Sequence, residues 1–430
     1  MTLFWFRRDL RIEDNTALQL ALSLGEPVLP VFIFDTQITE ELPKDDARIS
    51  FIHEALESIH KKLVAVGSSL LIRKGNPVEE IQKICKEYSI TSLCYNRDYE
   101  PYARARDKAV SDFCKLNNIQ TQHAKDHVIF EPHEVLKADK TPYTVYTPYK
   151  KAWLKKFETI SIERTDSTLN NYFKHSCAVP TLQQLGFIES SIHAKKIDMS
   201  TVKDYDKHRD IPHMDATSKL GVYLRFGTKS IRKIVQESND SAKGNEIFLS
   251  ELVWREFFQQ IIFHFPKVVT HNFRPKYDGI QWRNDKEEFQ KWCDGKTGYP
   301  IVDAGMRELN ATGYMHNRVR MITAGFLCKH LLIDWKWGEA YFAKKLMDYE
   351  LAANNGNWQW AAGTGCDAAP YFRVFNPYTQ TKRFDAQLAY IKKWVPELET
   401  FEYPTAMVEH KFARERALST YKEGIEKSNL

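Results

Sequence analysis

The first 123 residues alternate short apolar runs with amphipathic stretches. Five runs rich in β-branched and aromatic side chains have the length of buried strands, and they are residues 3–6, 28–34, 69–73, 92–96 and 119–123. After the second run, isoleucine and leucine recur at steps of three and four and form one face of a helix: Ile49, Ile52, Leu56, Ile59 and Leu63. Another helix is predicted to begin at Asn76 and Pro77, where a capping residue precedes proline. This alternation predicts an α/β domain with a doubly wound, Rossmann-like parallel sheet.

The hydrophobic pattern changes after residue 130. The following segment carries prolines, tyrosines and lysines without strand periodicity, which is typical of a connection. Later periodicity is helical, most clearly over residues 246–264, 301–312, 316–334 and 338–354. The sequence therefore predicts an α/β domain over 1–130, an interdomain linker over 131–195 and an all-α domain over 196–430.

Composition places the chain among ordinary globular proteins and argues against disorder. Of its 430 residues, 43% are hydrophobic and 27% are charged, and a chain of this length exceeds what one core normally supports. The 61 basic residues only slightly outnumber the 56 acidic ones. This balance permits a local basic face but does not by itself indicate a nucleic-acid partner.

Several common types of site are missing from the sequence. Neither GxGxxG nor the phosphate loop is present, since Gln290 stands where a loop ending in GKT at 295–297 would need glycine. The seven cysteines are scattered without CxxC or zinc-type spacing, so we expect a reducing compartment and no metal. Arginines interrupt the apolar start, and no apolar stretch reaches the roughly 20 residues of a membrane span. We therefore expect a cytoplasmic protein without a membrane partner, and we expect a monomer.

Tryptophan concentrates in the helical half of the chain. Seven of the ten tryptophans lie between residues 254 and 360. Trp358 and Trp360 stand among asparagine, glycine and alanine in AANNGNWQWAAGTG (352–365). Such surroundings fit either core tryptophans beside a tight turn or a pocket for a planar ligand.

Two helical motifs combine charged and apolar residues. In FLSELVWREFF, Glu251 and Trp254 are three residues apart and share a face, which suits a pocket for a flat ligand or a solvated carboxylate beside a core indole. In MHNRVRM, Asn317 and Met321 share a face beside Arg318, a pattern that an ordinary basic helix also shows. Spacing alone leaves these alternatives open.

Taken together, these segments resemble the photolyase/cryptochrome family over nearly the whole chain. WFRRDLRIEDNTAL opens the chain as in that family, and other matching segments are TSKLG, ELVWREFF, GKTGYPIVDAGMRELNATGYMHNRVRM, LLIDWKWGE and DYELAANNGNWQWAAGTGCDAAPYFRVFNP. The resemblance is closest to the class I enzymes, which repair cyclobutane pyrimidine dimers in DNA. It implies FAD folded inside the helical domain and light-driven electron transfer from excited, reduced FAD to a flipped-out dimer.

The resemblance also implies residues that bind the cofactor. They are Tyr205, Thr217, Ser218, Leu220, Gly221, Arg255, Asp348, Glu350 and Asn354. Asp348 and Glu350 would contact the isoalloxazine side, and Gly221 replaces a serine that is common in the family. Asn354 matches the residue facing flavin N5, where plant-type cryptochromes carry aspartate. An amide is not a ready proton donor, which favours a fully reduced, anionic flavin and hence repair over signalling.

A lesion pocket and an electron relay are implied in the same way. Trp254 and Trp360 would stack on the flipped dimer. Glu251 and Asn317 would stabilise the developing negative charge, and Met321 would fill the pocket. Contacts to the DNA backbone or the flanking nucleotides are implied for Arg209, Arg318, Arg373 and Gln380. The relay that photoreduces resting FAD is implied for Trp358, Trp335 and Trp282.

A second, light-harvesting chromophore is implied for the amino-terminal domain. Tyr102 and Ala103 stand where folate-binding relatives have asparagine and glutamate, so folate, a deazaflavin, a second flavin or an empty site all stay open. The main alternative function is a blue-light photoreceptor that signals through a protein partner, which is expected to have a long tail after the flavin domain. A single-strand-specific relative of the DASH type is a third alternative, and WQW and HNRVRM argue against it.

Overall fold

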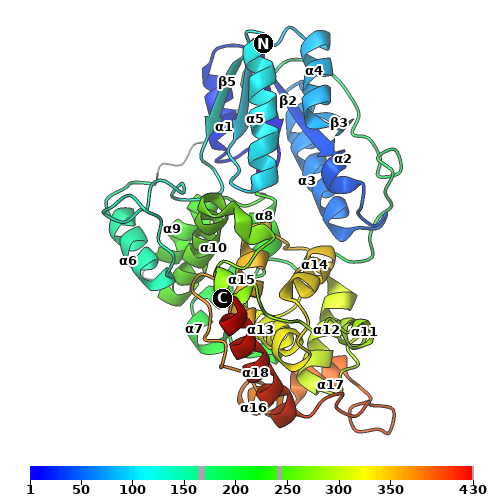
Figure 1. The fold of residues 1–430 in the computed structure, drawn as a ribbon. Helices are drawn as coiled ribbons and strands as arrows, with labels where there is room; N and C mark the ends of the chain where they lie inside the picture. The colour runs from blue at the N-terminus through cyan, green and yellow to red at the C-terminus, as the bar shows by residue number, and fades with distance from the viewer. Residues whose placement is uncertain (163–169, 240–244, 429–430) are drawn as a thin grey trace. The chain divides into compact units, whose positions relative to one another are not determined.

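The chain folds into two compact units. The computed structural model describes residues 1–162, 170–239 and 245–428 (Figure 1). The sheet unit comprises Met1–Val135, Trp153–Lys196 and Leu220–Asp240. The helical unit comprises Leu136–Ala152, Ile197–Lys219 and Ser241–Leu430.

A five-stranded parallel sheet organises the sheet unit, as the apolar runs predict. Its strands are β1 (Thr2–Phe6), β2 (Val28–Asp35), β3 (Leu71–Gly75), β4 (Ser92–Asn96) and β5 (Gln120–Ala124). Their order is β3-β2-β1-β4-β5, with Phe4 of β1 opposite Pro30 on one side and Cys94 on the other. The order reverses between β1 and β4, which is the doubly wound arrangement. The predicted fold class is confirmed.

Successive residues of β1 bury on opposite faces of the sheet. Phe4 and Phe6 pack in a core with residues of α1 and α3, and Leu3 and Trp5 pack in a second core with residues of α4 and α5. The helices of the sheet unit are α1 (Thr16–Ser23), α2 (Thr36–Thr39), α3 (Ala47–Val64), α4 (Pro77–Glu87), α5 (Pro101–Leu116), α8 (Gly221–Arg225) and α9 (Ile231–Asn239). Helix α4 begins where the sequence predicts, because the Asn76 side chain accepts the Val78 N–H at 3.0 Å.

Helices and short turns make up the helical unit, together with the start of α6 (Tyr146–Phe157). The helices are α7 (Tyr205–His208), α10 (Glu246–His264), α11 (Lys286–Cys293), α12 (Pro300–Thr312), α13 (Asn317–Gly325), α14 (Trp335–Lys345), α15 (Leu351–Ala362), α16 (Pro377–Phe384), α17 (Ala389–Trp394) and α18 (His410–Ser428). The 3₁₀ turns are η1 (Met199–Val202), η2 (Pro212–Met214), η3 (Pro266–Val269) and η4 (Pro275–Tyr277). Helix α10 has the predicted bounds, with Asn245 accepting the N–H groups of Ile247 and Phe248.

Two of the predicted helical segments are interrupted. The segment 316–334 holds α13 and then a π-helical turn, η5 (Phe326–His330). Within η5, the buried Lys329 donates to the Ala362 carbonyl at 2.7 Å, at the end of α15. The prediction of helix throughout 338–354 is wrong, because residues 346–350 leave the helix between α14 and α15. This break lets the Asp348 carboxylate pair with an arginine on α13.

The segment predicted to be a linker takes part in the core of the sheet unit. Tyr172, Leu185 and Phe187 are buried with residues of α3 and the sheet. The chain also pairs with the start of β2, since Phe173 N–H donates to Val28 O at 2.8 Å. These apolar residues are irregularly spaced, so the hydrophobic pattern does not predict that they are buried. Residues 163–169 of this segment lie outside the described residues.

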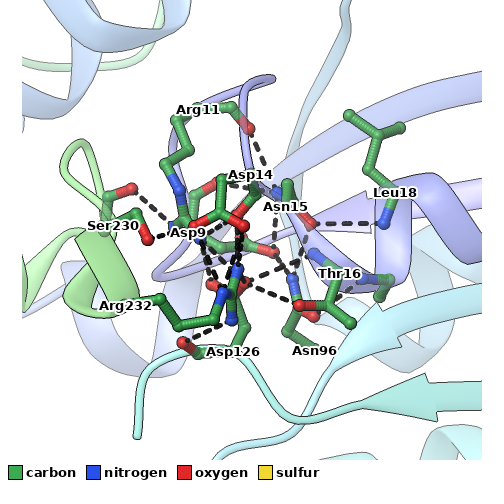
Figure 2. Close-up of polar contacts among 12 residues, drawn as sticks. Asp9, Arg11, Asp14, Asn15, Thr16, Leu18, Asn96, Asp126, Ser230 and Arg232 are labelled. Atoms are coloured by element: carbon green, nitrogen blue, oxygen red, sulfur yellow. Dashed lines mark hydrogen bonds and ion pairs between the residues drawn. The ribbon is translucent and has the colours of Figure 1, made fainter. Parts of the chain in front are cut away.

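Residues 220–239 also belong with the sheet, although the sequence predicts a helical domain from residue 196. Arg232 of α9 pairs with Asp14 and with Asp126, each at 3.0 Å, and Arg11 pairs with Asp126 at 2.8 Å (Figure 2). Ser230 donates to Asp14 in the same cluster. Buried carboxylates of this kind need charged partners, and the chain supplies one of them from more than 200 residues away.

Replacing Arg232 tests this anchor. We expect Arg232→Ala to lower the free energy of unfolding by about 2–3 kcal/mol, because hydrogen bonds to buried charges are lost while Arg11 still compensates Asp126. The exposed ion pair of Lys62 and Glu13 provides the control. Lys62→Ala should change the free energy of unfolding by less than about 0.5 kcal/mol. Urea unfolding measures both variants, and equal midpoints would contradict the assignment.

Candidate functional site

Helix α10 presents three of the predicted site residues on neighbouring turns. Glu251, Trp254 and Arg255 are partly exposed, while Leu252 and Val253 are buried on another face. The Glu251 carboxylate accepts from Arg209, which follows α7. Burial raises the pKa of Glu251, and Arg209 only partly opposes this shift. Glu251 therefore binds a proton more readily than an exposed glutamate.

Arg209 and Arg318, both predicted DNA contacts, lie in one charged cluster. Arg318 pairs with Asp210 at 2.7 Å, next to Arg209 in the chain. Its guanidinium also contacts the Met321 sulfur at 3.7 Å and lies 4.4 Å from the centroid of the Phe384 ring. The structure thus brings together Arg209, Glu251, Arg318 and Met321.

A group of hydrogen-bond donors surrounds the predicted cofactor residue Thr217. Lys219 donates to the Thr217 hydroxyl at 2.7 Å and to the Tyr314 hydroxyl at 3.3 Å. The two hydroxyls are themselves 3.2 Å apart. Lys219 also pairs with the Asp215 carboxylate at 2.5 Å, and its ammonium group together with the two hydroxyls is suited to binding a phosphate. Sequence reasoning missed Lys219, although it stands inside the matched TSKLG segment, and it missed Tyr314.

His316 contributes an unused polar atom close by. Its Nδ1 accepts the Arg318 N–H at 3.2 Å and caps α13. Burial, followed by the charge of Lys219, lowers the pKa of His316 to about 4, so the ring is neutral and carries its proton on Nε2. Within the described parts of the chain, this buried Nε2 has no hydrogen-bond partner. A buried donor of this kind indicates a missing acceptor.

Both carboxylates predicted on the isoalloxazine side are held by arginine. Asp348 accepts two hydrogen bonds from Arg320, at 3.1 and 2.9 Å. Glu350 accepts from Arg255 at 3.0 Å. Arg320 also donates to the Met315 carbonyl at 2.8 Å, which fixes its orientation. Sequence reasoning named Arg255 but missed Arg320.

The Asn354 amide has a defined orientation. Its nitrogen donates to the Glu339 carbonyl at 3.1 Å and to the Glu339 carboxylate at 2.8 Å. Both amide protons are thereby used, and the side-chain oxygen remains as an acceptor. Burial raises the pKa of Glu339, and the bond from Asn354 partly opposes the shift. Glu339 lies on α14, and no local spacing in the sequence connects it with Asn354.

The three predicted relay tryptophans lie in or against one apolar core. Trp358 and Trp335 are 2% and 1% exposed, and Trp282 is partly buried. Trp358 meets Trp292 edge-on at 6.1 Å between ring centroids, and a Cβ on Gly338 would meet its ring at 2.1 Å. The Trp335 indole donates to the Asn272 side chain at 2.9 Å.

The other predicted residues differ in how far they are exposed. Asn317 and Arg373 are exposed, and Trp360 and Gln380 are partly exposed. Tyr205 is the first residue of α7. Its ring packs edge-on against Phe248, with 5.2 Å between the ring centroids. The buried Ser218 lies in the helical unit, whereas Leu220 and Gly221, which come shortly after it in the chain, belong to the sheet unit.

The described residues show neither a metal site nor a membrane-spanning helix. No group of three or more histidine, cysteine, aspartate or glutamate side chains could hold a metal ion there. None of the helices described is long and apolar enough to cross a membrane.

Two known protein families match this chain. Residues 2–168 match the family described as DNA photolyase, and residues 248–402 match the FAD binding domain of DNA photolyase. The chain belongs to the DNA photolyase family, and the predicted resemblance is confirmed. A deoxyribodipyrimidine photo-lyase of Escherichia coli is 37% identical, with 97% of this chain and 98% of that protein covered.

Solved structures show the same fold. A bacterial class III photolyase from Agrobacterium tumefaciens has a TM-score of 0.88 at 31% identity, covering 99% of this chain and 98% of that one. An archaeal photolyase from Sulfolobus tokodaii has a TM-score of 0.84 at 33% identity, covering 98% of this chain and 99% of that one. The Sulfolobus structure contains two FAD molecules and is described as implying a novel light-harvesting cofactor.

Proposed function

We propose that this chain is a deoxyribodipyrimidine photo-lyase that uses light and FAD to split cyclobutane pyrimidine dimers in DNA. One observation carries the proposal: α10 bears Glu251 and Trp254, which we assign to the lesion, on the same rigid element as Arg255, which binds Glu350 and which we assign to the cofactor. The names of the relatives support repair over the photoreceptor alternative.

The side chains of the helical unit fit FAD. Lys219, Thr217 and Tyr314 would hold its phosphates, and the unpartnered Nε2–H of His316 offers a further donor nearby. Asp348 and Glu350 would accept from the ring system, with Arg320 and Arg255 fixing their positions. Once bound and reduced, FAD supplies the electron that light drives into the dimer.

Asn354 would favour the reduced form of the cofactor. Because its amide nitrogen is committed to Glu339, its oxygen can accept a hydrogen bond but the side chain cannot donate a proton. An aspartic acid at this position could donate one. This difference supports a repair enzyme rather than a photoreceptor.

The lesion would be held by stacking and by one polar contact. Trp254 and Trp360 would cover the faces of a dimer flipped out of the duplex, which costs less for a damaged base pair. Glu251, whose pKa is raised, would donate a hydrogen bond to a pyrimidine carbonyl where negative charge develops. Arg209, Arg318 and Arg373 would contact phosphates, so binding would weaken with salt.

The first test is a repair assay. The purified, chemically reduced protein is given an oligonucleotide with one thymine dimer and exposed to blue light, with a dark sample as control. We expect intact thymines to return only in the light. A flavin-loaded protein that neither binds the dimer preferentially nor repairs it would instead support the photoreceptor.

A second prediction concerns Glu251. We expect Glu251→Ala to lower the repair yield per absorbed photon about three- to tenfold, because the lost hydrogen bond to the carbonyl where negative charge develops is worth about 1 kcal/mol. FAD content should not change, since Glu251 is assigned to the lesion. Glu251→Gln keeps a donor at the same place and should retain most of the yield. Equal yields for wild type and Glu251→Ala would remove Glu251 from the mechanism.

A further inference from the structure

Trp254 is already stacked on one side by another residue of the chain. The ring of Tyr146 lies 3.6 Å from the Trp254 ring between centroids, at an angle of 8°. Tyr146 is only 7% exposed, whereas Trp254 is partly exposed. One face of the indole is therefore covered, and a nucleobase can stack only on the surface that remains.

Tyr146 is itself held in place from α10. Its hydroxyl is 2.7 Å from both the carbonyl and the side-chain oxygen of Ser250, one turn before Trp254. Further along α10, beyond Trp254, Gln260 donates to the carbonyl of Tyr143 at 2.8 Å. The segment 143–146 is thus fastened to α10 on both sides of the tryptophan.

The same segment reaches the loop after α15. The Tyr146 N–H donates to the Asp367 carboxylate at 3.0 Å. Arg274 holds this loop as well, by donating to the Cys366 carbonyl at 3.0 Å and to the Thr364 carbonyl at 3.1 Å. Trp360 lies in the last two turns of α15, directly before the loop.

We propose that Tyr146 is a positioning residue for lesion recognition. It fixes the plane of Trp254 by stacking, and through Asp367 it fixes Trp254 relative to the end of α15 that carries Trp360. The gap between the two tryptophans is then set before DNA arrives, so binding a flipped dimer does not have to order them. This inference rests on the proposed function, because it assigns the lesion to these two tryptophans.

The test compares two substitutions of Tyr146 in the FAD-loaded, full-length protein. Tyr146→Leu removes the ring, and Tyr146→Phe keeps the ring but removes the hydroxyl. We expect Tyr146→Leu to raise the dark Kd for an oligonucleotide with one thymine dimer about five- to tenfold, which is the worth of one aromatic pair. Tyr146→Phe should stay within about twofold of wild type, since the stack persists.

Three further measurements separate positioning from general damage. With Tyr146→Leu, the Kd for undamaged DNA and the repair yield per bound dimer should equal the wild-type values. Asp367→Ala breaks the tie to the α15 loop while leaving the stack, and we expect a smaller rise in the dimer Kd. If Tyr146→Leu does not fold, Asp367→Ala alone tests whether Tyr146 positions Trp254. In the double variant, the loss of binding free energy for the dimer should be smaller than the sum of the two single losses. Both substitutions act on the same connection between Trp254 and the α15 loop.

Several results would overturn the inference. They are an unchanged dimer Kd in both single variants, an equal loss of binding to damaged and undamaged DNA, and a lower yield per bound dimer with normal binding. Failure of the proposed function has a different signature, because the wild-type protein would then bind dimer-containing and undamaged DNA alike and repair neither.

Discussion

Trp358→Phe is expected to abolish photoreduction of oxidised FAD and to leave dimer repair by the chemically reduced enzyme intact. An indole gives up an electron far more easily than a phenyl ring, and Trp358 is one of the three proposed relay tryptophans. Phenylalanine is smaller and apolar, so the core should tolerate it, with a cost of about 1–3 kcal/mol from the lost volume. Bleaching of the oxidised flavin absorbance under blue light, with a thiol as final electron donor, measures photoreduction.

Trp292→Phe is the matched control for this experiment. Trp292 is fully buried in the same core and meets the Trp358 ring edge-on, but it is not part of the proposed relay. We expect Trp292→Phe to photoreduce at close to the wild-type rate and Trp335→Phe to be strongly impaired. Fast photoreduction in Trp358→Phe would refute the proposed relay. Loss of photoreduction in Trp292→Phe alone would show that electrons pass through Trp292 instead.

Arg320→Ala is expected to lose FAD. The arginine makes two hydrogen bonds to Asp348 and one to the Met315 carbonyl, so its removal leaves the carboxylate without this support. Burial alone would lower the pKa of Arg320, but Asp348 raises it above the ordinary value, so the guanidinium stays charged. Both side chains are partly exposed, and losing a hydrogen bond to a charged group costs about 1.5–3 kcal/mol, so the Kd for FAD should rise at least about tenfold.

The flavin content of the purified protein and fluorescence titration of the apoprotein measure this effect. Lys392→Ala removes an exposed ion pair with Glu399 in the same unit and should retain wild-type FAD. Asp348→Asn removes the charge but keeps an acceptor, and an intermediate loss is expected. Arg320→Ala with full FAD content and unchanged affinity would show that the pair does not support the cofactor.

Local periodicity predicted the elements of this protein well, because hydrophobic spacing reports directly on which face is buried. It placed the five strands, and it placed α10 with Glu251 and Trp254 on one side. It failed at 346–350, where the apolar pattern continues but the chain leaves the helix so that Asp348 meets Arg320. Such a break depends on a partner in another helix, which spacing within one segment cannot reveal.

The supporting residues of the candidate site were harder to predict. Glu339 and Asn354 are 15 positions apart on different helices, and Tyr314 and Thr217 are 97 apart. Tyr146 falls in a stretch whose prolines and lysines are typical of a linker. Arg232 likewise contacts Asp14 from 218 positions away. Contacts of this kind arise from tertiary folding and leave no periodic signal.

The π-helical turn η5 makes the chain sensitive to changes in length at this point. A π turn accommodates one residue more than an α turn, and each residue added to a helix rotates the remainder of that helix by about 100°. Deleting a single residue between Phe326 and His330 would restore α-helical pairing and would turn Lys329 away from the Ala362 carbonyl. It would also draw Trp335, at the start of α14, back by one residue through the non-helical segment 331–334. Substitutions here change one side chain, whereas a one-residue deletion would misalign the end of α15 and the proposed relay together.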